Sequence, residues 1–330
     1  MQYPDKRPLD PRTKRAQKLL AECVDAANAL LDNHATVGDL KMVRTVLREM
    51  ADGFRMFAAY SGRHKVTVFG SARTLPSDPN YKYAREFGRR MAEAGFMVIS
   101  GGGPGIMHAC LEGAGRANAF GVGIHLPFEQ AVNDAIQGDP KVALFTHFFT
   151  RKLFFLKEAE AVALLPGGFG TQDEGFETLT LVQTGKAQPM PIVALEAPGG
   201  NYWKTWQRYV EKDLLGNGLI SERDLSLFKV TTDIDEAVHE ITRYYRVYNS
   251  SRWVRDQLVL RLNHKLPRSL VTQLDIEFAD ILLKGSFEQR GAFRVERDDP
   301  RVWDLPRLAF HFDRHQFGRL RELIDRINLS

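Results

Sequence analysis

Short apolar runs alternate with helix-patterned stretches from about residue 64 to residue 245, and this alternation constrains the fold more than any other feature. The runs lack the polar alternation of half-exposed strands, so both faces of each strand must be buried. Strands of this kind, each followed by a helix, form a parallel sheet that helices cover on both faces. We therefore predict an α/β fold: a Rossmann-like, doubly wound parallel sheet. Strands are expected at 65–70, 96–100, 121–127, 161–166, 190–196 and 227–230.

The two ends of the chain have different patterns. Residues 13–60 read as two amphipathic helices joined near residues 33–39, with Asp39 as a cap for the second helix. Residues 249–330 mix strand-like and helical segments without a catalytic motif, which predicts a small α+β appendage of unknown role. The expected domains are an N-terminal helical extension (1–60), the Rossmann-like domain (61–248) and the C-terminal appendage (249–330).

Charge and cysteine content say less about the class of protein than the fold pattern does. Lys and Arg number 45 against 41 Asp and Glu, and no basic stripe with interleaved aromatic residues is present, so no nucleic-acid partner is expected. Cys23 and Cys110 are far apart without metal-ligand spacing, which is typical of a reduced compartment. The first residues include no apolar leader segment, and no run of 18 apolar residues occurs. We expect a soluble cytoplasmic protein with no membrane partner, no metal and no cofactor.

Three glycine-containing loops follow predicted strands, at residues 70–73, 101–105 and 166–171. In an open parallel sheet, ligands bind outside the carboxyl ends of the strands, where these loops must lie. Glycine lets backbone N–H groups approach a ligand closely, and a following helix start attracts an anion. The loops therefore predict a phosphate or nucleotide site, although each taken singly could be only a tight turn.

The glycine pattern differs from two common nucleotide loops. The segment 101–105 is not followed by the third glycine of GxGxxG, and the next strand does not end in an acidic residue, so a dinucleotide is disfavoured. Gly185 and Lys186 lack the upstream glycine and following Ser or Thr of a P-loop. The predicted ligand is a nucleotide held by other means.

Two charged features have competing interpretations. Thr171 and Glu174 have the T-x-x-E spacing of a capping box, in which Thr171 caps a helix and Glu174 bonds back to it. Glu174 could instead be the carboxylate of an enzyme. Arg151 and Lys152 are either site residues or an ordinary solvated pair on a helix. Spacing alone leaves both questions open.

Residues 66–73, 99–114 and 148–186 together resemble the Lonely Guy family of nucleoside 5′-monophosphate phosphoribohydrolases, many of which were once labelled "possible lysine decarboxylase". The resemblance spans about residues 64–245 and depends most on the PGGxGTxxE motif, residues 166–174, with an upstream Arg-Lys pair. It implies hydrolysis of the N-glycosidic bond of AMP or a cytokinin riboside monophosphate, which releases free base and ribose 5-phosphate. It also implies a homodimer or higher homo-oligomer with active sites near the interface.

The resemblance further implies site residues for such an AMP nucleosidase-like hydrolase. Arg151 and Glu174 match the catalytic Arg and Glu. The predicted substrate-binding residues are Ser71, Gly102, Gly103, Lys152, Gly167, Gly168, Gly170 and Thr171.

The expected chemistry centres on Glu174. Cleavage builds positive charge on the ribose ring, which a carboxylate stabilises or relieves by activating water. A glutamate at a helix start is expected to stay ionised. Arg151 would bind phosphate or ribose hydroxyls, and Asp173 and Glu177 would assist. Gly175 departs from the apolar residue usual in the family and predicts a closely approaching ligand or partner chain, or a looser helix start.

Three alternatives remain from the sequence. A non-catalytic nucleotide sensor or carrier would share the fold, although retention of Arg151 and Glu174 favours the enzyme. A pyridoxal-phosphate decarboxylase would need a Schiff-base lysine, for which Lys152 and Lys157 are available. A nucleic-acid-binding module has the least support.

Overall fold

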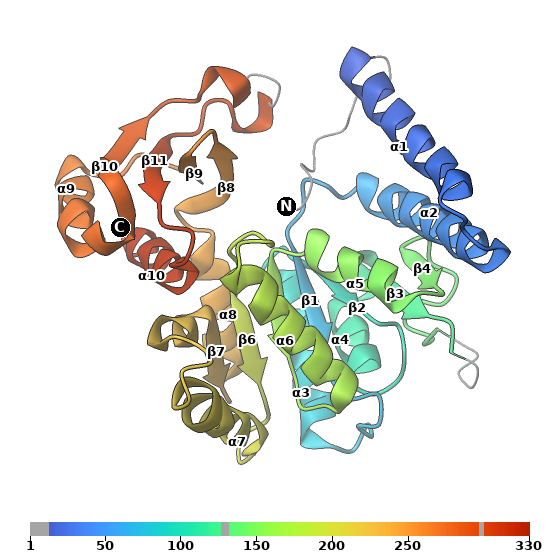
Figure 1. The fold of residues 1–330 in the computed structure, drawn as a ribbon. Coiled ribbons are helices and arrows are strands. Elements are labelled where there is room, and N and C mark those ends of the chain that lie inside the picture. The colour runs from blue at the N-terminus through green and yellow to red at the C-terminus, as the bar shows by residue number, and fades with distance from the viewer. Residues whose placement is uncertain (1–12, 127–131, 297–299) are drawn as a thin grey trace.

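The computed structural model describes residues 13–126, 132–296 and 300–330, which form a parallel sheet and a smaller antiparallel sheet, each covered by helices (Figure 1). The parallel sheet is seven-stranded with the order β4-β3-β2-β1-β5-β6-β7. This arrangement confirms the predicted α/β fold. The strands are β1 (Lys65–Phe69), β2 (Met97–Ser100), β3 (Ala119–Ile124), β4 (Val142–Phe145), β5 (Ala161–Leu164), β6 (Ile192–Leu195) and β7 (Phe228–Thr231).

Helices cover both faces of this sheet because successive strand residues point to opposite sides. In β1, Val66 and Val68 pack into the core with α3, α4 and α8, whereas Phe69 packs into the core with α2, α5, α6 and α7. The bounds are α2 (Val37–Ala58), α3 (Pro79–Glu93), α4 (Ile106–Ala114), α5 (Phe148–Lys157), α6 (Phe169–Gln183), α7 (Tyr202–Tyr209, continued by a π-helical turn at Val210–Leu215) and α8 (Ile234–Tyr244).

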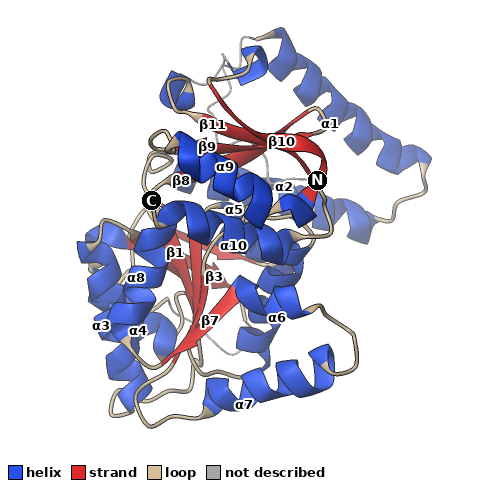
Figure 2. Ribbon diagram, turned by 90° about the vertical axis from the view of Figure 1, so that its left-hand side faces the viewer, coloured by secondary structure: helices blue, strands red, loops and turns tan. Residues whose placement is uncertain are grey.

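The N-terminal segment forms α1 (Lys14–Asp32) and α2, as predicted, while residues 1–12 lie outside the described part. The cap of α2 is Thr36 rather than Asp39. Thr36 Oγ1 accepts the Asp39 N–H at 3.2 Å, and Asp39 accepts the Thr36 N–H at 2.8 Å, which completes a capping box. Helix α2 packs on the sheet through Phe57, whereas α1 extends away from it and buries only Ala16 (Figures 1 and 2).

The order in which successive strands are added to the sheet reverses between β1 and β5, while all strands stay parallel. From β1 the chain runs outward through β2 and β3 to the edge strand β4, and then returns through α5 to β5 on the other side of β1. The carboxyl ends of β1 and β5 are adjacent, yet their connections leave in opposite directions, which opens a crevice there. Strand β4 was not predicted; its position at the edge of the sheet leaves Leu144 exposed and weakens the apolar pattern.

The C-terminal part is a four-stranded antiparallel sheet with the order β10-β11-β9-β8, packed against helices (Figure 2). This confirms an α+β appendage, although the sequence pattern missed β8 and β10 at the two edges. Strand β8 begins at Tyr248, the last residue assigned to the α/β domain; the three-domain division otherwise stays a prediction. The elements are β8 (Tyr248–Val254), β9 (Gln257–Leu262), α9 (Arg268–Glu277), β10 (Leu282–Arg290), β11 (Arg307–Phe312) and α10 (Phe317–Asn328).

No helix formed by the described residues is long and apolar enough to cross a membrane.

Asn328 joins the last helix to the connection between the two sheets. Its fully buried side chain accepts the N–H groups of Val247 and Tyr248 at 2.8 and 3.1 Å and donates to the Tyr244 carbonyl at 2.6 Å. Replacing Asn328 with alanine should lower the free energy of unfolding by about 2–4 kcal/mol, because these buried groups lose their partners. Urea denaturation would measure this loss.

The control for this experiment is Asn249→Ala, which removes a solvent-exposed hydrogen bond to Asn263. We expect it to change stability by less than about 1 kcal/mol. Equal losses in the two variants would show that Asn328 does not join the two parts.

Candidate functional site

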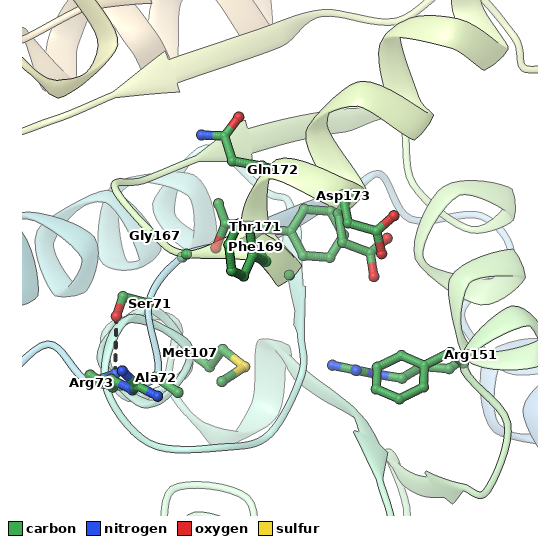
Figure 3. A pocket seen from close by; sticks show the side chains of 16 residues that line it. Ser71, Ala72, Arg73, Met107, Arg151, Gly167, Phe169, Thr171, Gln172 and Asp173 are labelled. Atoms are coloured by element: carbon green, nitrogen blue, oxygen red, sulfur yellow. Dashed lines mark hydrogen bonds between the residues drawn. The ribbon is translucent and has the colours of Figure 1, made fainter. Parts of the chain in front are cut away.

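A cavity of about 660 Å³ lies at the carboxyl ends of β1 and β5, where the strand order reverses. Helix α4 contributes Met107 to its wall, and α5 contributes Phe148 and Arg151 (Figure 3). The remaining lining comes from two segments. Residues 69–73 include the end of β1 and the loop after it, and residues 167–174 follow β5. The sequence-predicted loops after these two strands therefore meet around one cavity.

The loops are held together by backbone contacts that leave no room for side chains. The Ser71 N–H donates to the Pro166 carbonyl at 3.1 Å. A Cβ on Gly167 would lie 2.1 Å from Thr171 Oγ1. Gly105 has a φ of 67°, and a Cβ there would lie 2.3 Å from the Ser71 carbonyl oxygen. Glycine at 105 is therefore required by the backbone, whereas glycine at 167 leaves room for the Thr171 side chain.

Tyr202, from α7, fixes the loop after β5. Its hydroxyl donates to the Gly167 carbonyl at 2.5 Å and accepts from Gln172 Nε2 at 2.6 Å. The sequence analysis gave this residue no role in the site, because it lies 30 positions from Gln172. Phe169, the first residue of α6, is 96% exposed beside the cavity, and it was not predicted as a site residue either.

The predicted capping box does not form. Helix α6 begins at Phe169 with Gly168 at the N-cap and without a side-chain cap. Thr171 is therefore inside the first turn, so it is not the cap that its spacing suggested, and Glu174 lies in the second turn. The capping interpretation of Glu174 is wrong, and its carboxyl group lines the cavity instead.

Burial dominates the electrostatics of Glu174. The residue is only 6% exposed, and its Oε2 has no hydrogen-bond partner among the described residues. Desolvation raises the pKa of Glu174 to about 7, against the opposing charges of Lys152 and Arg151. The expectation of a fully ionised carboxylate is therefore wrong, because the helix dipole acts mainly on the first turn. A group that titrates near neutrality can both accept and return a proton.

Lys152 is not part of the cavity lining, and it joins α5 to α6. Its Nζ contacts Asp173 Oδ2 at 2.8 Å and Glu177 Oε2 at 3.0 Å. Burial alone would lower the pKa of Lys152, but these two partners outweigh burial and raise it. A Schiff-base lysine needs a neutral, reachable amine. Lys152 does not fit that role, and Lys157 is paired with Glu158 outside the cavity lining.

Arg151 reaches toward the cavity from α5 on the side opposite Ser71 (Figure 3). Its Nε donates to the Val122 carbonyl at 2.9 Å, and its guanidinium lies 4.9 Å from the centre of the Phe155 ring. A Cβ on Gly101 would come within 2.6 Å of Arg151 Nη2, so this glycine leaves space for the guanidinium. The arginine is a permanent positive charge held in one orientation.

The structure brings most of the predicted site residues to the cavity but not all of them. Gly102 and Gly103 lie outside its lining, and both accept hydrogen bonds from Asn133, at 2.8 and 3.0 Å. Lys152 is also outside it. The roles of all these residues in binding or catalysis stay predictions. Those that line the cavity are Ser71, Arg151, Gly167, Gly168, Gly170, Thr171 and Glu174.

Gly175 is explained by the sheet beneath it. It lies in the second turn of α6, and a Cβ there would lie 3.2 Å from Leu164 Cδ1 at the end of β5. The close neighbour is thus a core side chain of this chain, and neither a ligand nor a partner chain is needed to account for the glycine.

Among the residues that the structure describes, no group of three or more His, Cys, Asp or Glu is arranged to hold a metal ion.

A parallel sheet whose glycine-rich loops, arginine and buried carboxylate surround one cavity defines a Rossmann-like protein with a small-ligand site. The family model described as "Possible lysine decarboxylase" matches residues 107–241. A "Probable cytokinin riboside 5'-monophosphate phosphoribohydrolase LOGL2" from Oryza sativa subsp. japonica is 22% identical over 202 residues, or 59% of this chain and 80% of the rice protein. The chain is therefore similar to the Lonely Guy family, and the family model limits its match to residues 107–241.

Solved structures are similar at lower coverage of this chain. The structural genomics target TM1055 is 25% identical, with a TM-score of 0.38 over 53% of this chain and 96% of that one. The molybdenum cofactor carrier protein from Chlamydomonas reinhardtii is 19% identical, with a TM-score of 0.35 over 53% of this chain and 94% of that one.

Proposed function

We propose that the protein hydrolyses the N-glycosidic bond of a nucleoside 5′-monophosphate, of the AMP or cytokinin riboside monophosphate type. The observation that carries this proposal is Glu174, a buried carboxyl group with an unpartnered oxygen that lines a cavity beside a fixed arginine. The name of the rice relative supports the same reaction class.

The cavity offers one place for each part of such a substrate. The glycine-rich loop at 167–170 and the N-terminus of α6 present backbone N–H groups and the positive end of the helix dipole to the phosphate. Arg151 adds a permanent charge for phosphate or ribose hydroxyls. Phe148 and Phe169 supply apolar surface at the same cavity.

Glu174 would act on the ribose. As the C1′–N bond breaks, its electron pair passes to the base, and positive charge develops on the sugar ring. The ionised carboxylate stabilises that charge and accepts a proton from the water that attacks C1′. A pKa near neutrality then lets the group pass this proton to the departing nitrogen, so that the base is released in its neutral form and the carboxylate is regenerated.

The proposal is tested by incubating the full chain with AMP and measuring free adenine and ribose 5-phosphate by chromatography. We expect equal amounts of both products. A panel of other nucleoside monophosphates would then define the preferred base. If AMP binds but remains intact over prolonged incubation, the protein is a carrier or sensor and the proposal fails.

The reaction should depend on pH through Glu174. Since burial raises its pKa to about 7, the ionised form is lost as the pH falls below that value. We expect kcat/KM to fall by about tenfold for each pH unit below neutrality and to level off above it. A rate profile between pH 5 and pH 9 measures this. A flat profile through pH 7 would contradict a role for the ionised carboxylate.

A further inference from the structure

The N-terminal helix α2 places a buried carboxylate at the start of α5, the helix that carries Arg151. Glu49 is only 7% exposed. Its Oε1 accepts the backbone N–H of Thr146, and its Oε2 accepts the hydroxyl of Thr150. The Nδ1 atom of His147 lies 3.5 Å from the same Oε2. One side chain from outside the sheet thus contacts three residues around the first turn of α5.

This carboxylate supplies what the local sequence of α5 lacks. The N-cap residue, His147, makes no side-chain cap hydrogen bond. A negative charge at a helix N-terminus is favourable, because the first N–H groups are unpaired and the dipole is positive there. Burial alone would raise the pKa of Glu49, but the bonds from Thr150 and Thr146 outweigh burial and lower it. Glu49 therefore acts as an electrostatic cap from another helix: it accepts the Thr146 N–H just before α5 and the Thr150 hydroxyl within its first turn.

Close contacts keep α2 in register along α5 (Figure 1). One turn after Glu49, a Cβ on Gly53 would lie 2.2 Å from the Phe154 ring, so only glycine permits this approach. The ring of Phe57 stacks with Phe154 at a centroid distance of 6.1 Å. Lys157 Nζ lies 5.2 Å from the centre of the Phe54 ring, near the end of α5. The two helices therefore run side by side, with Glu49 at the first turn of α5.

Arg151 follows this first turn directly. Its N–H donates to the His147 carbonyl at 3.3 Å, and its neighbour Thr150 is bonded to Glu49. The guanidinium is bound to the Val122 carbonyl and lies in the space left by Gly101. A displaced first turn would therefore misplace the guanidinium in a space that tolerates little movement.

We propose that Glu49 is a positioning residue that holds the start of α5 and so orients Arg151 toward the substrate. The N-terminal helices then belong to the site and are not an independent appendage. The expected effect of Glu49 on kcat/KM rests on the proposed function. Its effect on the start of α5 does not depend on any substrate.

The kinetic test compares Glu49→Gln with Asp52→Asn. Asp52 lies on the same helix, but its side chain is 56% exposed and forms an ion pair with the exposed Arg55. We expect Glu49→Gln to lower kcat/KM for AMP by about tenfold or more, since hydrogen bonds to a charged group are lost. Asp52→Asn should leave it within about twofold.

A double-substitution cycle separates positioning from general destabilisation. If Glu49 acts through Arg151, Glu49→Gln should have no further effect on kcat/KM in an Arg151→Ala background. Additive effects in the double variant would overturn the inference, as would an unchanged kcat/KM in Glu49→Gln.

Hydrogen exchange gives a readout without substrate and so distinguishes the two proposals. In Glu49→Gln, the exchange rate of amides at the start of α5 should rise by about tenfold or more, whereas amides in α3 should exchange as in wild type. In Asp52→Asn, the exchange rates at the start of α5 should not change. If the wild-type protein does not cleave AMP, the proposed function fails while this measurement still decides the role of Glu49. Unchanged exchange at residues 146–152 would refute the capping role.

Discussion

Replacing Glu174 with glutamine is expected to lower kcat for the release of adenine from AMP by about 100- to 10,000-fold. The amide keeps the size of the side chain but can neither accept a proton from water nor carry the charge that opposes the developing positive ribose. Binding of AMP should change little, because the glycine-rich loops and Arg151 remain. Single-turnover kinetics and calorimetric titration with AMP would measure the two quantities separately.

Stability should move in the opposite direction in the same variant. The pKa of Glu174 is raised from 4.5 to about 7 by folding, so the folded state binds more protons than the unfolded state between these values. The ionised carboxylate therefore lowers stability as the pH rises through this window, and its full cost applies above pH 7. Glu174→Gln should be more stable than wild type at pH 8, by up to about 3 kcal/mol, with little difference below pH 4.5.

The matched control is Glu222→Gln, at an exposed glutamate outside the cavity lining. It should leave kcat and the pH dependence of stability as they are in wild type. Wild-type activity in Glu174→Gln would remove this residue from the mechanism, whatever the change in stability.

Replacing Arg151 with alanine should lower kcat/KM by about 10- to 100-fold for each charge-assisted hydrogen bond lost to the substrate. Lysine should restore little of this, because the bond to the Val122 carbonyl and the stacking on Phe155 require a planar guanidinium. The charge of Arg151 also lowers the pKa of Glu174. Its removal should therefore move the midpoint of the pH profile to higher pH.

Arg85→Ala is the control for this prediction, since Arg85 forms an ion pair with Glu112 between α3 and α4 and does not line the cavity. Steady-state kinetics at several pH values would compare the two variants. A loss of activity without a shifted pH midpoint would mean that Arg151 and Glu174 do not interact in the site.

Most of the strands that the sequence predicted in the parallel sheet are buried on both faces, although the partly buried edge strand β7 was predicted too. In β5 every residue is apolar, and in β1 three of the five are, so the burial of these strands is evident from their composition. The missed strands β4, β8 and β10 lie at sheet edges, where partial exposure dilutes the apolar pattern. Edge position depends on the pairing of distant segments, which local patterns do not contain.

The site was predictable where its residues lie in one motif. Glu174 was found from its place after the glycines, but the T-x-x-E spacing suggested a cap at Thr171 because the true helix start, Phe169, lies between glycines. The raised pKa of Glu174 could not be predicted, since it depends on burial in the folded protein. Tyr202 and Glu49 were missed because folding alone brings them to the loop and to α5.

The strand order of the parallel sheet also determines which segments of the chain can fold in isolation. The segment matched by the family model, residues 107–241, begins within α4 and ends within α8, so it omits β1 and β2. An excised piece with these limits would leave β3 and β5 with no strand between them, because β2 and β1 lie there. Each would expose a row of unpaired backbone groups on a hydrophobic strand, which favours aggregation between copies.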